Sequence, residues 1–567
     1  MSVATSPGTP RPTPARALLE WLSAAAVAQQ FAGIAQRLRA PLPALASERK
    51  LALDTAMRLG QYGQALPAFI VLSQLRHELP SDAEVCVRHD IERACGIAGW
   101  HEQQGRPAAA LAAADTLLRQ VPWHRPTRML RAIVLAERGE AAAAVAEYRR
   151  ILDTVPGDAI AGSALLIAMQ HDPAQSADAI ADAHRAWAAR HMPQVAARWP
   201  AWMAQADPGR PLRIGWLSPR FFSGLVADFF LGVLKKFDRA EAKHVLYDTG
   251  GIDDAVSARF RAAADEWHRV DELDDAALCE RIRADRIDVL VELGGHSPGN
   301  RLRAFAWRPA PVQATWLDYF HSTGTEAVDV LVSDAMLSPP RFAHRYSERV
   351  LALPSGRLCW SPPADAPPVV PHATAPLRFA SFNRVNKIND DVLAAWSRIL
   401  AGAPGSVLRL KARAFDLADE RAHFLARCAK HGVVAARLEL LGYGSHAQAL
   451  AAYADVDIAL DTFPFSGCAT SLDALWMGVP VVTLGGETMV SRQGASLLTS
   501  LGLEEWIADD ADGYVRRALD LANDAARRYA LRAGLRDRVR ERLCDVDRHA
   551  RELSGALRGA WRHWCAV

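Results

Sequence analysis

The chain has 567 residues, enough for three or four domains rather than one. Half of the residues are hydrophobic and 23% are charged, an ordinary globular composition, and the net charge of +2 argues against a nucleic-acid-binding protein. The eight cysteines form no CxxC pair, which favours reduced thiols in a cytoplasmic protein over a disulfide framework. No apolar run is long enough to span a membrane, so we expect no membrane partner.

Residues 1–16 are rich in Pro, Ser and Thr and predict a disordered leader, whereas residues 17–205 have helical apolar spacing. Gly63, Gly105 and Gly139 each precede a proline by 17 residues, and the last two glycines are 34 residues apart. A 34-residue helix–turn–helix period is typical of tetratricopeptide repeats, although the first step here is 42 residues. We predict an all-α, superhelical repeat domain that binds extended polypeptides, with an ordinary helical bundle as the alternative.

After a short linker at residues 206–211, apolar runs alternate with helical segments, as in LRIGWLS, IDVLVELGG and VDVLVSD. This alternation is typical of βαβ units and a parallel sheet. A proline-rich stretch then separates a second alternating set, which includes LRFASFN, SVLRLKAR and VDIALDT. We predict two doubly wound α/β domains, at residues 212–372 and 377–545, followed by a helical tail at 546–567 that packs back onto them.

The most informative segment follows an apolar run in the second set. A strand at residues 458–460 ends at Asp461, a loop of small residues follows, and a helix opens near Thr470. Loops at the carboxyl ends of parallel strands form the ligand crevice of such sheets, and the free N–H groups of a helix N-terminus bind anions. The segment therefore predicts a diphosphate site.

The nearby pair Asp455 and Asp457 has the DxD spacing of a metal site. The pair lies at the entrance to a buried strand, where structural acids are the more common case, so we predict no metal.

Several segments resemble, in order and spacing, the tetratricopeptide-linked O-GlcNAc transferases and their bacterial and SPINDLY-type relatives. The resemblance covers residues 212–521 and rests on GGHSPGNRLRAFAWRPAPVQATWLDY, ASFNRVNKIN, LDTFPFSGCATSLDALWMGVPVVT and ETMVSRQGASLL. It implies a GT-B fold, in which two Rossmann-like domains face a cleft, and a nucleotide-sugar donor. It also implies inverting, metal-independent transfer of a sugar from a UDP-sugar to Ser or Thr of a polypeptide, or to Asn.

The resemblance assigns the leaving-group cation to Lys387, with Arg384 as a weaker second cation and Asn383 holding the loop. A surface lysine at a helix start is the structural alternative, although the helix dipole disfavours a cation there. Asp473 is expected to bind the ribose hydroxyls, and the loop 442–446 to bind the base. The expected donor-binding residues are Asn383, Arg384, Lys387, Gly444, His446, Phe465, Ser466, Gly467, Cys468, Ala469, Thr470 and Asp473.

The general base is the open question. Animal-type members carry a histidine in the segment that aligns with SPRFFSGLVADFF, and Gly224 occupies that position here. Three other residues are candidates for base catalysis: Asp228, His296 and His321. Cys468 and Ala469 also depart from the histidine and threonine of animal-type loops.

The expected function is a protein glycosyltransferase with N-acetylglucosamine as the first choice of sugar and glucose as the second. Two alternatives stay open: a repeat scaffold whose GT-B module binds nucleotide without catalysis, and a GT-B enzyme acting on a saccharide or small molecule. The expected partners are a UDP-sugar and a polypeptide acceptor presented by the repeats, and self-association into a homo-oligomer stays open.

Overall fold

The computed structural model describes residues 12–27, 31–61, 64–192, 206–371 and 375–566. The chain divides into two units. The first unit comprises residues 1–134, 150–158 and 272–274, and the second comprises residues 135–149, 159–271 and 275–567. Both sheets belong to the second unit. None of the described helices combines the length and the apolar character that crossing a membrane requires.

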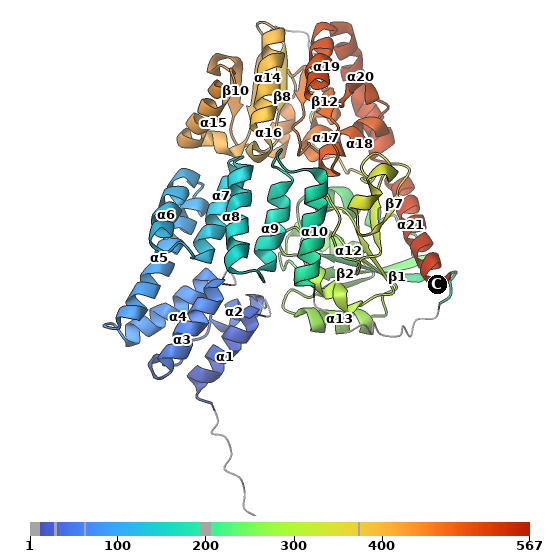
Figure 1. The fold of residues 1–567 in the computed structure, drawn as a ribbon. Helices are drawn as coiled ribbons and strands as arrows, with labels where there is room; N and C mark the ends of the chain where they lie inside the picture. The colour runs from blue at the N-terminus through green and yellow to red at the C-terminus, as the bar shows by residue number, and fades with distance from the viewer. Residues whose placement is uncertain (1–11, 28–30, 62–63, 193–205, 372–374, 567) are drawn as a thin grey trace, which may run out of the picture. The chain divides into compact units, whose positions relative to one another are not determined.

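Consecutive helices form the N-terminal region, drawn from blue to green in Figure 1. They are α1 (Pro14–Val27), α2 (Phe31–Arg37), α3 (Arg49–Gln61), α4 (Ala65–Glu78), α5 (Ala83–Gln103), α6 (Pro107–Gln120), α7 (Arg125–Glu137), α8 (Ala141–Thr154), α9 (Ala159–Met169) and α10 (Ala177–His191), with the short 3-10 turn η1 (Ala46–Glu48) before α3. Helix α1 thus begins inside the segment expected as a leader, of which residues 1–11 lie outside the described part.

The expected glycine turns join successive helices. Gly105 and Gly139 have φ angles of 67° and 82°, which non-glycine residues rarely adopt, and each ends a helix with its N–H bonded to the carbonyl three residues earlier. Helices α6 and α8 begin 34 residues apart, as predicted, whereas α5 has 21 residues and α7 only 13. Because α5 is longer than α7, the step from Gly63 to Gly105 is 42 residues and the step from Gly105 to Gly139 is 34. Gly63 lies outside the described residues.

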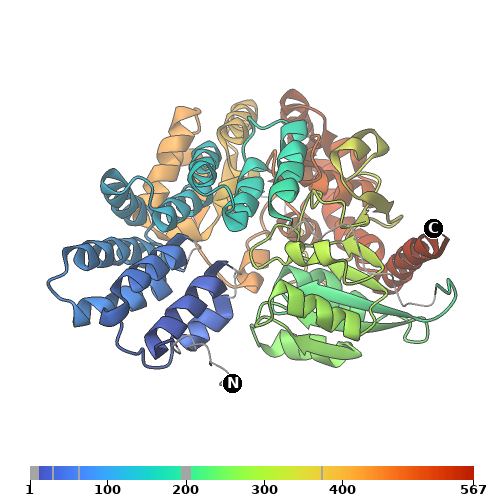
Figure 2. The same cartoon turned by 60° about the horizontal axis from the view of Figure 1, so that its bottom comes forward.

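The helices of the first unit pack pairwise around their own apolar core, and their blue ribbons lie side by side in Figure 2. Ion pairs recur at the repeat spacing: Arg49 Nε lies 2.5 Å from Asp82 Oδ2, and Arg125 Nε lies 2.7 Å from Asp158 Oδ2, both 33 residues apart. Asp82 also caps α5 by accepting from the Val85 N–H. Helices α9 and α10 belong instead to the second unit.

The first sheet has seven parallel strands in the order β3-β2-β1-β4-β5-β6-β7. The strands are β1 (Leu212–Ser218), β2 (Ala242–Asp248), β3 (Glu266–Arg269), β4 (Val289–Glu292), β5 (Val312–Thr315), β6 (Val330–Ser333) and β7 (Arg349–Ala352). Strands β4, β5 and β6 are buried along their whole length, as expected for a parallel sheet covered on both faces. The connecting helices are η2 (Ala227–Leu231), α11 (Gly232–Leu234), α12 (Ala255–Ala263), α13 (Asp275–Ala284), η3 (Leu302–Trp307) and η4 (Pro340–Arg345).

The second sheet has six parallel strands in the order β10-β9-β8-β11-β12-β13. They are β8 (Arg378–Ser381), β9 (Val407–Lys411), β10 (Leu438–Leu441), β11 (Ile458–Leu460), β12 (Val481–Leu484) and β13 (Ile507–Ala508). The helices between them are η5 (Val385–Lys387), α14 (Asp390–Gly402), η6 (Arg413–Asp416), α15 (Ala418–Lys430), η7 (Ala435–Arg437), α16 (His446–Ala451), α17 (Ala469–Trp476), η8 (Val490–Arg492), α18 (Gln493–Ser500), η9 (Glu504–Trp506) and α19 (Ala511–Asn523). In each sheet the order reverses beside the first strand, which creates a switch point between β1 and β4 and another between β8 and β11.

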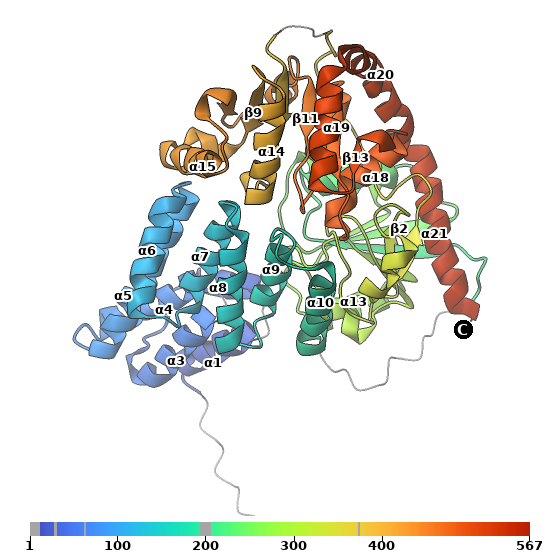
Figure 3. The ribbon, with the colours of Figure 1, turned by 45° about the horizontal axis from the view of Figure 1, so that its top comes forward.

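Two long helices, α20 (Ala525–Leu543) and α21 (Val546–Ala566), end the chain and are drawn in dark red in Figure 3. Helix α21 returns to the first sheet domain: His549 stacks on Trp316, and the Glu552 carboxylate accepts from the Ser355 hydroxyl at 2.6 Å. The Trp561 indole N–H donates to the Asp207 carbonyl at 3.0 Å. The prediction that the helical tail packs back onto the α/β region is confirmed.

Candidate functional site

The predicted diphosphate loop lies at the switch point of the second sheet, where the carboxyl ends of β8 and β11 adjoin. A small cavity opens at this point, and Asn383, Asp461 and Thr470 are among the residues that line it. Ligands of doubly wound sheets bind at such switch points. The predicted loop therefore lies at a switch point of its sheet, and its role as a diphosphate site stays a prediction.

Asp461 organises the loop. Its side chain is 2% exposed, and Oδ1 accepts hydrogen bonds from the Gly467 N–H at 2.5 Å and the Thr462 N–H at 2.8 Å. Oδ2 accepts from the Thr483 hydroxyl at 2.8 Å. Burial raises the pKa of this carboxyl, while the hydrogen bonds favour its ionised form. Asp461, which follows β11, thus fixes the conformation of the loop through these hydrogen bonds.

Gly467 is the tightest point of the loop. A Cβ there would lie 2.4 Å from Ser471 Oγ and 2.8 Å from Asp461 Oδ1, so no other residue fits without a shift. The close approach of the loop to the start of α17 depends on this missing side chain.

Lys387 ends the turn η5 and reaches the same loop. Its Nζ donates to the Ser466 carbonyl at 3.0 Å and lies 4.5 Å from the centre of the Phe465 ring. Burial lowers the pKa of Lys387 to about 8, and the Asp461 carboxylate opposes that shift. The cation that the resemblance assigns to the leaving group is therefore in contact with the predicted loop.

Asn383 and Thr470 connect the two walls of the cavity. The Thr470 hydroxyl donates to Asn383 Oδ1 at 2.9 Å, and the Asn383 amide donates to Ser381 Oγ at 3.3 Å. Helix α17 begins at Ala469 with Cys468 as its N-cap, so Thr470 lies in the first turn of the helix. Arg384 is exposed at the start of η5.

A second group of predicted residues meets beside the loop 442–446. His446 Nε2 lies 3.1 Å from Asp473 Oδ1, and this hydrogen bond is the main cause that raises the pKa of His446. Asp228 lies on η2 of the first sheet domain, and burial raises its pKa. It is also close enough to feel two charges of the second sheet domain: His446 lowers its pKa and Asp473 raises it. Gly444 precedes Ser445, whose side chain caps α16. The structure thus brings Asp228, His446 and Asp473 together.

His296 and His321 are 1% and 2% exposed and pack against α10. His296 Nε2 donates to the Thr323 carbonyl at 2.9 Å, and its Nδ1 lies 3.1 Å from Ser163 Oγ on α9. His321 stacks on His184 of α10, with ring centres 4.3 Å apart. Burial lowers the pKa of both rings well below the usual value, which keeps them neutral. Their predicted role as bases remains untested, and their hydrogen bonds and stacking tie α9 and α10 to the first sheet domain.

Three residues near the site were absent from the predicted set. The His171 ring, between α9 and α10, stacks on Phe465 at 4.2 Å. The positive charges of Arg357 and Lys387 both act on the Cys468 thiol, whose pKa burial raises to about 11. Asp318 follows β5 in the first sheet. Its place just after a strand was a usable signal in the sequence, whereas the approach of His171 and Arg357 depends on contacts between distant segments.

Both acids of the DxD pair contact Arg378. Asp455 Oδ1 lies 2.5 Å from Arg409 Nη1, and its Oδ2 lies 2.8 Å from Arg378 Nη1. Asp457 accepts the backbone N–H of Arg378 at 2.8 Å. These acids join β8, β9 and β11 at the edge of the sheet opposite to the site.

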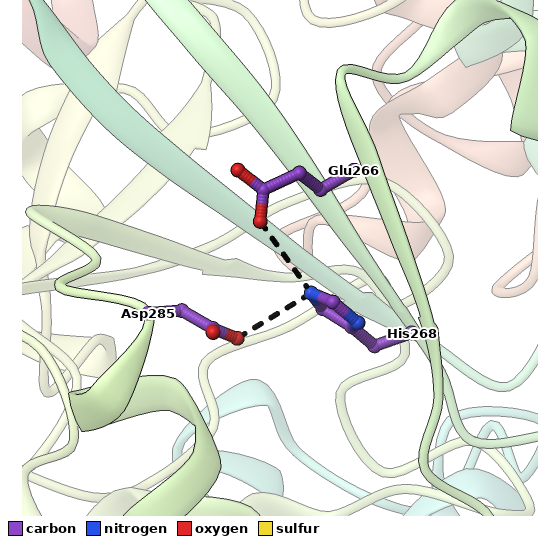
Figure 4. A group of neighbouring side chains, drawn as sticks. All are labelled: Glu266, His268 and Asp285. Carbon is purple, nitrogen blue, oxygen red and sulfur yellow. Dashed lines mark ion pairs between the residues drawn. The ribbon is translucent and has the colours of Figure 1, made fainter.

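In the described part of the chain, one group of acids and a histidine has metal-like spacing: Glu266, His268 and Asp285 (Figure 4). It belongs to the outer strand β3 and the end of α13, away from either switch point. Arginines already neutralise both acids, since Arg213 pairs with Glu266 at 2.8 Å and Arg281 with Asp285 at 2.8 Å. The group fits a surface ion-pair network better than a cation site.

Comparison with known proteins shows which family the chain resembles. The profile of glycosyl transferase family 41 matches residues 164–358 and 371–553. Two plant proteins described as probable UDP-N-acetylglucosamine–peptide N-acetylglucosaminyltransferase SPINDLY, from Solanum lycopersicum and Arabidopsis thaliana, are each 35% identical over 422 residues. The alignments cover 72% of this chain but 45% and 46% of the relatives, so the chain spans about half the length of these curated relatives.

A solved structure agrees in fold. A mutant of the Thermobaculum terrenum O-GlcNAc transferase superposes with a TM-score of 0.79 at 33% identity, over 91% of this chain and 98% of that one. The prediction of a helical region followed by a GT-B fold is confirmed by this match and by the two Rossmann-like strand orders. The chain therefore belongs to glycosyl transferase family 41.

Proposed function

We propose that the chain is an inverting, metal-independent glycosyltransferase that moves a sugar from a UDP-sugar to Ser or Thr, or to Asn, of a polypeptide. The observation that carries the proposal is the contact of the Lys387 ammonium with the Ser466 carbonyl, in the loop that leads into α17. The names of the SPINDLY relatives, which specify UDP-N-acetylglucosamine and a peptide, support N-acetylglucosamine as the first choice of sugar and glucose as the second.

The chemistry asks the protein to stabilise a departing nucleoside diphosphate. Lys387 supplies a positive charge, and the first N–H groups of α17 supply hydrogen-bond donors. A cation and a helix N-terminus together meet the developing charge without a metal. The acceptor oxygen attacks the anomeric carbon on the face opposite to the departing phosphate, which inverts the configuration.

A donor panel tests the proposal. The purified chain is incubated with UDP- and GDP-sugars and with lysate proteins or peptides, and transfer is read as a mass increase of the intact acceptor. We expect transfer from UDP-N-acetylglucosamine, with long polypeptides better acceptors than short peptides if the helical repeats present them. Transfer to saccharides alone would favour the small-molecule alternative.

The scaffold alternative also rests on an observation. Gly224 carries no side chain, nothing lies within 4 Å of where its Cβ would be, and both candidate histidines are buried. Tight UDP binding without turnover of any donor, including its hydrolysis, would establish the scaffold. We also propose a reducing, cytoplasmic compartment, because the eight cysteines form no CxxC pair in the sequence.

Asp473→Ala raises the KM for the donor about 10- to 150-fold with kcat little changed, because a hydrogen bond to a charged group contributes about 1.5–3 kcal/mol. The carboxylate pairs with His446 at the predicted ribose subsite, away from the breaking bond. Steady-state kinetics with varied donor give both constants. Asp520→Ala, an exposed acid on α19, is the control. A large fall in kcat at constant KM contradicts the ribose role.

A further inference from the structure

Asp318 is an acid that the predicted mechanism does not use. It lies just beyond β5, at the carboxyl edge of the first sheet, and its side chain is 8% exposed. Its Oδ2 lies 2.8 Å from Nε of Arg220, which follows β1 at the same edge. Neither of these two atoms has a hydrogen bond of good geometry among the described residues. The pair thus retains hydrogen-bonding capacity at the edge where ligands of doubly wound sheets bind.

The segment around Asp318 contacts the loop of the second sheet domain that contains Phe465 and Ser466. Two residues further on, the Phe320 ring packs edge to face against the Phe465 ring, with centres 5.3 Å apart. The Lys387 ammonium lies 4.5 Å from the centre of the same Phe465 ring. Arg357 Nη2 donates to the carbonyls on either side of Asp318, those of Leu317 at 3.0 Å and Tyr319 at 2.6 Å. These contacts place Asp318 in the wall that adjoins the Lys387 loop.

The charges around Asp318 suit proton transfer near neutral pH. Burial raises the pKa of Asp318 to about 6, and the charge of Arg220, the Ser297 side chain and the charge of Arg357 oppose that shift, in that order. The other acid that faces it is Glu292, which is buried and whose own pKa burial raises to about 7. A carboxylate in this range is ionised at pH 7 and still basic enough to accept a proton.

The other three candidates for the general base lie among different residues. Asp228 interacts with His446 and Asp473, at the predicted ribose and base subsites. His296 and His321 are held among α9, α10 and the first sheet domain by hydrogen bonds and stacking. Arg357, whose charge acts on Asp318, also acts on Cys468 in the loop that the Lys387 ammonium contacts.

We propose that Asp318 is the general base of the transfer reaction, an inference that rests on the proposed function. The acceptor O–H, or side-chain N–H for Asn, gives its proton to the Asp318 carboxylate as the acceptor atom forms its bond to the anomeric carbon. The bond between the anomeric carbon and the β-phosphate oxygen breaks at the same time. Its electron pair leaves with the nucleoside diphosphate, which faces Lys387.

The test compares pH profiles of kcat/KM for the wild-type protein and Asp318→Asn. The wild type should lose activity as the pH falls through about 6, because the base becomes protonated. Asp318→Asn should lower kcat about 10²–10⁴-fold and abolish this limb, with UDP affinity within threefold of wild type. Glu326→Gln, an exposed acid in the same loop, is the control and should match the wild type.

Arg220→Met supplies a signature that a purely structural role would not produce. Removal of the guanidinium takes away the charge that opposes protonation of Asp318, so the acid limb should move to higher pH. This variant keeps the carboxylate and tests the inference even if Asp318→Asn folds poorly.

The outcomes separate the two proposals. A wild-type protein that transfers no sugar from any donor contradicts the proposed function itself. An active wild type whose Asp318→Asn variant keeps kcat within threefold, or keeps the acid limb, overturns the inference alone. A higher donor KM at unchanged kcat also overturns it, because Asp318 would then bind a sugar hydroxyl instead of accepting a proton.

Discussion

Lys387→Ala lowers the kcat of sugar transfer about 10²–10³-fold while the protein stays folded. Loss of one group that stabilises charge in the transition state costs about 2.7–4 kcal/mol, or about 10²–10³ in kcat. The size of the effect follows from the position of the ammonium, which lies 3.0 Å from the Ser466 carbonyl beside the start of α17. Single-turnover transfer from the best donor of the panel measures the loss.

Lys430→Ala is the matched control, because Lys430 is an exposed lysine on α15 of the same domain. It should transfer sugar at the wild-type rate, and both variants should keep the wild-type circular dichroism spectrum. Activity of Lys387→Ala within a factor of three of wild type would remove this lysine from the mechanism.

The protonation of Lys387 adds a pH dependence to the same prediction. Burial lowers its pKa to about 8, so kcat/KM should fall as the pH rises through about 8 and the ammonium loses its proton. Lys387→Arg keeps its charge in this range, so its remaining activity should lack that alkaline limb. An unchanged limb in Lys387→Arg would assign the ionisation to another group.

Asp461→Ala lowers the free energy of unfolding by about 3 kcal/mol or more and abolishes UDP binding. Each buried donor left without an acceptor costs about 1–3 kcal/mol, and this substitution leaves two backbone N–H groups and the Thr483 hydroxyl unpaired. The loop that Asp461 folds also loses its shape. Chemical denaturation and calorimetric titration with UDP measure the two effects.

Asp520→Ala serves again as the control and should change stability by less than about 0.5 kcal/mol, since Asp520 is exposed. If Asp461→Ala unfolds like the wild type, the hydrogen bonds of the loop contribute little. If it binds UDP normally, the loop is not the diphosphate site.

Local patterns predicted most strands and the loop of small residues at the carboxyl end of β11. The apolar run before Asp461 is a strand and the small-residue loop precedes a helix, because both follow from spacing within a dozen residues. Strands β3, β7 and β13 were not predicted. EWHR has a single apolar residue, RVLA is only four residues long and not fully buried, and β13 has two residues, so their pattern is weak. Strands β3 and β7 are the outer strands of the first sheet.

Several predicted site residues lie in the second sheet domain, but the sequence did not indicate which of them contact one another. Lys387 and Ser466 are 79 residues apart, and Asn383 and Thr470 are 87 apart. These pairs meet because parallel strands place their carboxyl ends at one edge, a consequence of the strand order. The strand order follows from the packing of the whole sheet and is absent from any single segment.

By itself, then, the sequence determined the helical N-terminal region, two α/β domains and the loop of small residues that follows Asp461. These features depend on local periodicity and on the backbone freedom of residues such as Gly467. Only the tertiary structure decided that His296 and His321 are buried against α10 and that Asp318 pairs with Arg220. The pKa and exposure of such a group depend on segments far away in the chain, because burial and opposite charges are properties of the assembled fold.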